Sequence, residues 1–139
     1  MSGLIIQEET IKRYDDMRFR KTAGGLVLKI NDETIEVESE ELDGNFQTVV
    51  SALPENEPRY VLYDIPLKNR ANIEVVKTVF VFWMPMESPV RLRMQYASSK
   101  TLIIKYFRGI AAQLQCEEKK ELEMDKIIKQ VYKTQGINN

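Results

Sequence analysis

The stretch IEVVKTVFVFWMPMESPVRLRMQYASSK, residues 73–100, decides the fold because it holds a strand and the start of a long helix in succession. Residues 73–83 are dominated by valine and aromatic side chains, which favour strands. An apolar run of this length predicts a central strand buried on both faces, with Trp83 in the core. Pro85 closes the strand, because proline cannot donate to a sheet ladder.

The helix that follows has both a start signal and a stop signal. Ser88 before Pro89 is typical of a helix start, with serine as the N-cap and proline at the first helical position. Gly109 is a typical C-terminal stop. We therefore expect one helix over residues 89–108.

A helical wheel at 100° per residue divides this helix into two arcs. We expect the apolar arc to meet the sheet; it comprises Tyr96, Ala97, Ile103, Ile104 and Phe107. The opposite arc mixes apolar and cationic side chains: Arg91, Met94, Ser98, Leu102 and Lys105. Such a mixture is typical of a protein-binding patch, the alternative being that Met94 and Leu102 pack under a neighbouring loop. Arg93 and Lys100 project near the apolar arc.

Period-2 and period-3.6 patterns predict further elements around this pair. The expected helices cover about residues 7–18, 42–52 and 121–134, and the expected strands cover residues 26–30, 34–38, 59–65 and 110–115. The run Ala23-Gly24-Gly25 predicts a break before the strand at residue 26. The order predicts an α/β fold, one mixed sheet with helices on its faces, in a single domain over residues 1–139.

The composition excludes several classes of function. The 139 residues are 43% hydrophobic and 29% charged, an ordinary globular balance. Lys and Arg number 20 against 21 Asp and Glu, a net charge of −1, so we expect no nucleic-acid partner. No apolar run approaches the roughly 20 residues of a membrane span, and Leu4–Ile6 is too short for a signal peptide, so we expect a cytoplasmic protein.

The sequence offers no catalytic or metal-binding constellation. It has no His and only one Cys, Cys116, which excludes His-based triads, His-ligated metals and four-cysteine zinc sites. Neighbouring acids such as Asp15 and Asp16 point apart on a helix, and neither phosphate-loop pattern occurs. We expect a protein that is not an enzyme and uses no cofactor or metal.

Three lysines share one face of the last expected helix. Lys126, Lys129 and Lys133 fall within about 60° of one another at 100° per residue. This face is either a site for an acidic partner or a solvated surface near a helix C-terminus, where cations are favoured.

The stretch from Phe82 to Lys100 resembles the signature of the actin-depolymerising factor/cofilin family. In that signature Trp-x-Pro ends the central strand, and Pro-Val-Arg-x-Lys/Arg-Met-x-Tyr-Ala-Ser-Ser-Lys opens the long helix. Three other stretches are similar to the family: Met1–Gly3, Leu53–Asp64 and Phe107–Ile110. The resemblance covers nearly the whole chain, and the expected order of elements agrees with it.

The resemblance implies the actin-depolymerising-factor homology fold, a central five- to six-stranded mixed sheet flanked by helices on both faces. It implies a monomer that binds actin monomers and filaments and promotes filament depolymerisation and severing. The positions that match the family's monomer-and-filament contacts are Ser2, Gly3, Arg91, Arg93, Met94, Ser98 and Lys100. It also implies phosphoinositide binding through basic residues, and residence in the cytoplasm and cytoskeleton, with the nucleus as a further compartment.

A second surface of the family contacts only filaments, and the matching positions here are Lys77, Lys129 and Lys133. Val75 and Gln130 stand where basic residues are usual, and Lys129 stands where an acidic residue is common. The resemblance therefore implies a weakened filament site.

The run Arg18-Phe19-Arg20-Lys21 is similar to a different branch, glia maturation factor. That branch regulates the actin branching complex and has little direct affinity for actin. The combination of Trp83 with Pro85, and of Arg91 with Arg93, favours cofilin.

Overall fold

The structure is a computed structural model that describes residues 4–135. Its elements, in chain order, are β1 (Ile5–Ile6), α1 (Glu8–Arg20), β2 (Gly24–Asn31), β3 (Thr34–Glu41), α2 (Phe46–Ala52), β4 (Arg59–Lys68), β5 (Glu74–Trp83), α3 (Val90–Tyr106), β6 (Ile110–Cys116), a short 3-10 helix (Lys119–Glu121) and α4 (Met124–Thr134).

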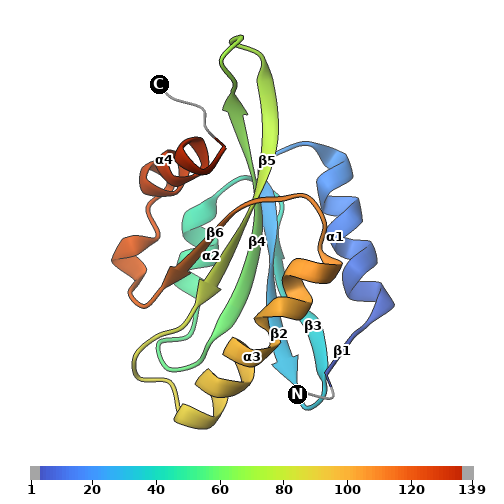
Figure 1. Ribbon diagram of the computed structural model, residues 1–139, viewed down its shortest axis with the longest axis vertical. Coiled ribbons are helices and arrows are strands. Elements are labelled where there is room, and N and C mark those ends of the chain that lie inside the picture. The colour runs from blue at the N-terminus through green and yellow to red at the C-terminus, as the bar shows by residue number, and fades with distance from the viewer. Residues whose placement is uncertain (1–3, 136–139) are drawn as a thin grey trace.

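One mixed sheet of six strands forms the middle layer, in the order β1-β3-β2-β4-β5-β6. The pairs β1–β3 and β5–β6 are parallel, and the other neighbours are antiparallel. α1 and α3 cover one face of the sheet, while α2 and α4 cover the other (Figure 1). The expected mixed sheet with helices on both faces is confirmed.

Residue parity along β5 separates two hydrophobic cores. Val79, Val81 and Trp83 pack with α2 and α4, whereas Phe80 and Phe82 pack with α1 and α3. Successive side chains of a strand point to opposite faces, so a strand covered on both sides must be apolar at every position. This requirement explains the continuous apolar run Val79–Trp83, which is the buried part of β5.

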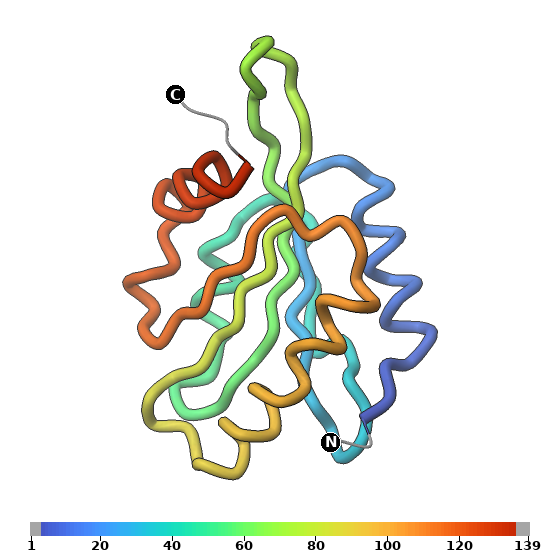
Figure 2. Tube along the Cα trace, viewed as in Figure 1, coloured from blue at the N-terminus to red at the C-terminus, as the bar shows by residue number. Residues whose placement is uncertain are grey.

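The hairpin between β4 and β5 extends beyond the helical layers (Figures 1 and 2). The two strands pair along their full length of 10 residues each. Asn69 closes the loop, because its Oδ1 accepts hydrogen bonds from the backbone N–H groups of Ala71, at 2.9 Å, and Ile73, at 3.0 Å. A side chain that replaces backbone partners in this way fixes a polar loop without a core beneath it.

Gly24 and Gly25 are buried residues of β2 and not a break before it, so that expectation is wrong. A Cβ on Gly25 would meet the carbonyl oxygen of Leu62 and would lie 2.5 Å from Cδ2 of Tyr63 on the adjacent β4. Glycine is required here because two strands approach closely, which residue patterns do not reveal.

Several boundaries also differ from the expectation. α3 begins at Val90, after an N-cap at Pro89, and ends at Tyr106. α2 begins at Phe46 because β3 continues to Glu41, and α4 begins at Met124 after the 3-10 turn. β1 was not expected, since two residues are too few to show a period.

The close approach at Gly25 yields a stability prediction. Gly25→Ala should lower the free energy of unfolding by about 2 kcal/mol, because overpacking of this kind typically costs about 1–3 kcal/mol. The measurement is urea unfolding followed by fluorescence. Gly44→Ala is the control: Gly44 is exposed at φ 83°, and an added Cβ would lie 3.3 Å from the Ala23 Cβ, so the change should cost about 1 kcal/mol, mainly from backbone strain. Equal losses in the two variants would contradict the role of strand proximity.

Candidate functional site

α3 meets the sheet through one stripe of side chains. The fully buried members are Tyr96, Ser99, Ile103 and, directly after the helix, Phe107. The expectation is wrong at Ala97, which is exposed. The buried position is Ser99, whose hydroxyl donates to the carbonyl of Gln95 at 2.8 Å and is thereby satisfied within its own helix.

Two tyrosines fasten the middle of α3 to the sheet. The Tyr60 hydroxyl donates to the backbone carbonyl of Tyr96 at 2.5 Å, and the backbone N–H of Ile30 donates to the Tyr96 hydroxyl at 2.9 Å. The two rings pack with their centroids 5.1 Å apart. Burial raises the pKa of Tyr60 and of Tyr96, so both hydroxyls stay protonated at neutral pH and the Tyr60 donor is always available.

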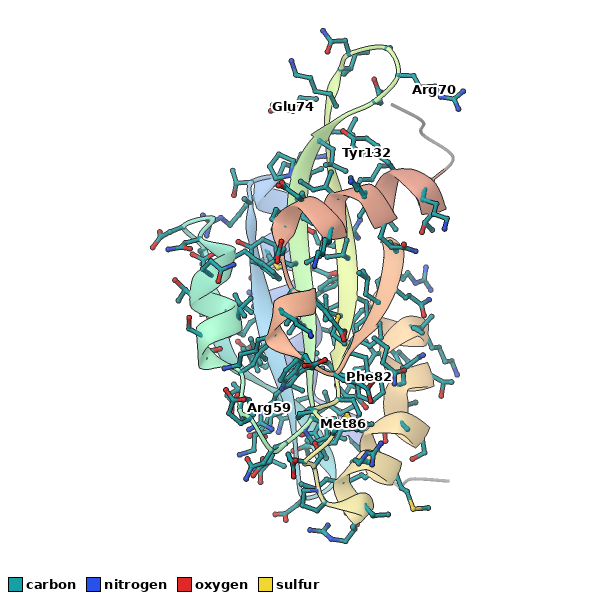
Figure 3. All side chains as sticks on the ribbon, turned by 90° about the vertical axis from the view of Figure 1, so that its left-hand side faces the viewer. Arg59, Arg70, Glu74, Phe82, Met86 and Tyr132 are labelled. Atoms are coloured by element: carbon teal, nitrogen blue, oxygen red, sulfur yellow. The ribbon has the colours of Figure 1, made fainter. Side chains whose placement is uncertain are left out.

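A buried arginine braces the same end of the molecule. Arg59 is 5% exposed, and its guanidinium contacts both carboxylate oxygens of Glu38, at 2.9 and 3.1 Å, and Glu57 at 3.1 Å. Burial opposes the charge of Arg59, yet the Glu38 carboxylate leaves its pKa raised. Arg59 (labelled in Figure 3) pairs with Trp83 of β5, directly before the loop that leads to α3. The bidentate pair ties β3 to β4 below that loop.

The outward face of α3 combines apolar and cationic side chains. Val90 and Met94 are each 67% exposed, and Arg91 is exposed beside them, while Arg93 and Lys100 are half-buried. At 100° per residue, Arg91 and Arg93 point about 160° apart, with Met94 between them on the outward side. The face is therefore an apolar ridge with positive charge on both flanks, and Ser98 lies exposed on the same side.

Leu102 does not belong to this ridge. It lines an apolar groove of about 310 Å³ together with Leu4, Ile5, Ile6, Ile11 and Tyr106. Leu102 is half-buried and lines this groove, whereas Met94 is exposed. The groove brings the N-terminal segment beside α3. Ser2 and Gly3, which the sequence assigns to the same site, lie outside the described residues.

The other candidate cations lie on the opposite face of the sheet, near the projecting hairpin. Lys77 has the odd parity of Val79, so it points to the face that α4 covers. Lys129 and Lys133 are exposed on α4. The hydroxyl of Tyr132 donates to the carbonyl of Lys68 at 3.1 Å and joins α4 to the hairpin (Figure 3). The structure thus groups Lys77 with the α4 lysines and separates them from α3.

The described residues offer little for covalent chemistry. Burial, with Glu121 beside it, raises the pKa of the Cys116 thiol to about 12, so it is not a nucleophile at neutral pH. Within residues 4–135 no three His, Cys, Asp or Glu side chains gather where a metal ion could bind. In the same range, no helix has the length and apolar character to cross a membrane.

The family model described as cofilin/tropomyosin-type actin-binding protein matches residues 3–132. The chain belongs to this family. Its relatives include the cofilin of Ogataea parapolymorpha, 29% identical over 140 residues that cover 99% of this chain and 98% of the relative. Actin-depolymerizing factor 8 of Arabidopsis thaliana is 30% identical over 127 residues, 89% of this chain and 91% of the relative.

The fold agrees with this membership. The crystal structure of Streptomyces griseoflavus cofilin superposes with a TM-score of 0.83 at 23% identity, covering 93% of this chain and 99% of the other. In this fold, α3 carries the family's signature and has its outward face exposed.

Sequence reasoning missed two exposed apolar residues beside the signature. Val90 and Met86 are each 67% exposed; Val90 is the first residue of α3, and Met86 lies in the loop before it. The wheel contained only a partial signal for Val90, which falls between the two arcs, about 40° from Met94. Met86 had none, because it lies in a loop where no period applies. The fastening role of Tyr60 was also missed, since it depends on a contact between residues 36 apart in sequence.

The Tyr60 contact yields a second prediction. Tyr60→Phe removes only the hydroxyl and should lower the free energy of unfolding by about 1 kcal/mol, the usual net value of a buried hydrogen bond. Tyr132→Phe is the matched control, because its hydroxyl bond to Lys68 is exposed and water can replace it. Urea unfolding compares the two. A loss in Tyr132→Phe as large as that in Tyr60→Phe would refute the special role of the buried bond.

Proposed function

We propose that this chain binds monomeric and filamentous actin and promotes depolymerisation and severing of filaments. The observation that carries the proposal is the outward face of α3, where Val90 and Met94 are exposed between cationic flanks. Exposed apolar anchors in a charged rim are typical of protein interfaces. Membership of the cofilin family makes actin the partner to test first.

The proposed monomer-and-filament surface extends from α3 to the N-terminal segment. It comprises Ser2, Gly3, Arg91, Arg93, Met94, Ser98 and Lys100. The apolar ridge would enter an apolar cleft of actin, and the flanking cations would pair with acidic groups at the rim. Anionic phosphoinositide headgroups would compete for the same cations, because both ligands need the positive charge.

The proposed mechanism is differential binding and needs no covalent step. A protein that binds one conformation of actin more tightly than another shifts the population toward the tighter-binding form. Higher affinity for a twisted filament and for the ADP-bound monomer would then drive disassembly. We propose that the 139-residue chain does this as a single domain and a monomer in the cytoplasm.

A separate filament-only surface would hold the second actin subunit. It comprises Lys77, Lys129 and Lys133, which lie across the sheet from α3. Val75 on this face is apolar and packs against the core, so this position supplies no positive charge. A few exposed charges must then hold the second subunit, each worth about 0.3–1 kcal/mol.

The double variant Arg91→Ala with Arg93→Ala tests the first surface. It should weaken monomer binding by more than about 100-fold, because truncating a charged interface contact costs roughly 2–5 kcal/mol. Fluorescence titration of labelled monomeric actin measures this affinity. The charge-matched control is Lys129→Ala with Lys133→Ala, which should keep monomer affinity. Normal monomer binding by a folded Arg91→Ala and Arg93→Ala protein would sink the assignment of α3.

The variant Lys77→Ala tests the second surface. It should reduce filament binding and severing but spare monomer binding, and wild-type filament binding should fall steeply with salt, because exposed charges are screened within about 8–10 Å. Co-sedimentation across a salt series, beside monomer titration, measures both. Lys12→Ala, an exposed lysine on α1, is the control. Equal damage to monomer and filament binding, or filament affinity that ignores salt, would contradict the two-surface division.

A second candidate function is regulation of the actin branching complex in the manner of glia maturation factor. One observation favours it: Phe19, at the end of α1, is 86% exposed between two arginines. Pelleting with actin filaments discriminates the candidates. Co-sedimentation with pure filaments supports the first, whereas binding to the branching complex without co-sedimentation supports the second.

A further inference from the structure

The start of α3 carries two unmet hydrogen-bonding needs. Ser88 is 6% exposed, and its buried hydroxyl has no hydrogen-bond partner within residues 4–135. The N-cap of α3 is Pro89, which has no side-chain oxygen to accept from the first turn. The first N–H groups of the helix, from Val90 onward, therefore have no side-chain cap. A buried unpaired hydroxyl is destabilising by itself. That it lies directly before an uncapped helix therefore calls for an explanation.

A change of backbone conformation at Pro89, with an adjustment of the loop before it, would satisfy both needs. Pro89 has φ −55°, already a helical value, and ψ 140°, which is extended. Turning ψ to about −40° would add Pro89 to the helix as its first residue. Ser88 precedes a proline and so favours the extended conformation that an N-cap requires. Its hydroxyl would then accept from the N–H of Val90 or Arg91.

In the free protein, solvent stabilises the uncapped state. A bound partner would remove that stabilisation. The first turn is open to solvent, where Pro89, Val90 and Arg91 are exposed, so water can satisfy its N–H groups. The backbone N–H of Ser88 meanwhile donates to the carbonyl of Pro85 at 3.1 Å, which holds the loop. A partner that covers Val90 expels this water, and the N–H groups then need the Ser88 hydroxyl.

We propose that Ser88 is a positioning residue for the partner surface: on binding, α3 extends by one residue and the Ser88 hydroxyl caps it. The extension caps the first turn, which carries Arg91 and Arg93, and so stabilises it in the direction that the Tyr96 anchor sets. This inference rests on the proposed function, because it takes actin as the partner that covers α3. It differs from a purely structural role for Ser88, which would serve the free protein.

The variant Ser88→Ala separates stability from binding. In the free protein it removes an unpaired buried hydroxyl, so the melting temperature should rise by about 2–4 °C. In the complex it removes the cap, so affinity for labelled monomeric actin should fall about fivefold. A structural role would move both quantities in the same direction. Ser88→Thr, which keeps a capping hydroxyl, should restore the affinity. Ser51→Ala, at an exposed serine of α2, should change neither quantity.

Amide hydrogen exchange gives an independent readout. The N–H groups of Val90 and Arg91 should exchange fast in the free protein, become protected in the wild-type complex with actin, and stay less protected in the Ser88→Ala complex. Equal protection in the two complexes, or a Ser88→Ala protein that is less stable but binds actin normally, would overturn the proposal. Failure of the wild-type chain to bind actin at all would instead refute the proposed function, while the rise in melting temperature tests the free state separately.

Discussion

The hydrogen bond from the Tyr60 hydroxyl to the Tyr96 carbonyl fixes how α3 lies on the sheet. The bond is 2.5 Å long and joins the start of strand β4 to the middle of the helix. Both residues are fully buried. Ile30 anchors the same Tyr96 side chain from β2. Two strands, β2 and β4, therefore converge on one residue of α3. Everything that α3 presents to a partner, from Arg91 to Lys100, takes its direction from this point, because a rigid helix transmits the orientation of its anchor along its length.

Strand parity then decides where the second surface lies. In β5 the even residues pack under α1 and α3, and the odd residues pack under α2 and α4. Lys77 is odd, so its charge is on the α4 side, separated from the α3 ridge by the whole sheet. A one-residue shift in the register of β5 would move Lys77 to the α3 face and break both cores at once. The separation of the two candidate surfaces is thus as strongly fixed as the core itself.

The sequence alone predicts what depends on local periods and misses what depends on contacts. The alternation of β3 and the stripe of α4 gave correct elements, and the family signature identified the cationic ridge. The wheel predicted Ala97 as a buried residue, but Ser99 is buried in its place. A serine that donates to a carbonyl of its own helix, here that of Gln95, can be buried at little cost. Gly25 reads as a loop residue until the approach of β4 is known. Ser88 and Pro89 form a helix start by every local rule. In the structure, however, Ser88 is buried and its hydroxyl does not cap the helix.

Charge distribution shows why net charge is a poor guide to the partners of this protein. The chain is nearly neutral, at −1, but its acids and bases are used differently. On β3, Glu38 pairs with Arg59, Glu40 with Arg13, and Glu41 accepts from the Tyr63 hydroxyl at 2.8 Å. These carboxylates are bound by groups of the same molecule. Arg91 on α3 and the lysines Lys129 and Lys133 on α4 are exposed, and no ion pair links them to an acid of the described chain. A nearly neutral protein can still present local basic patches, because its unpaired cations gather on α3 and α4 while many of its acids lie on other parts of the surface.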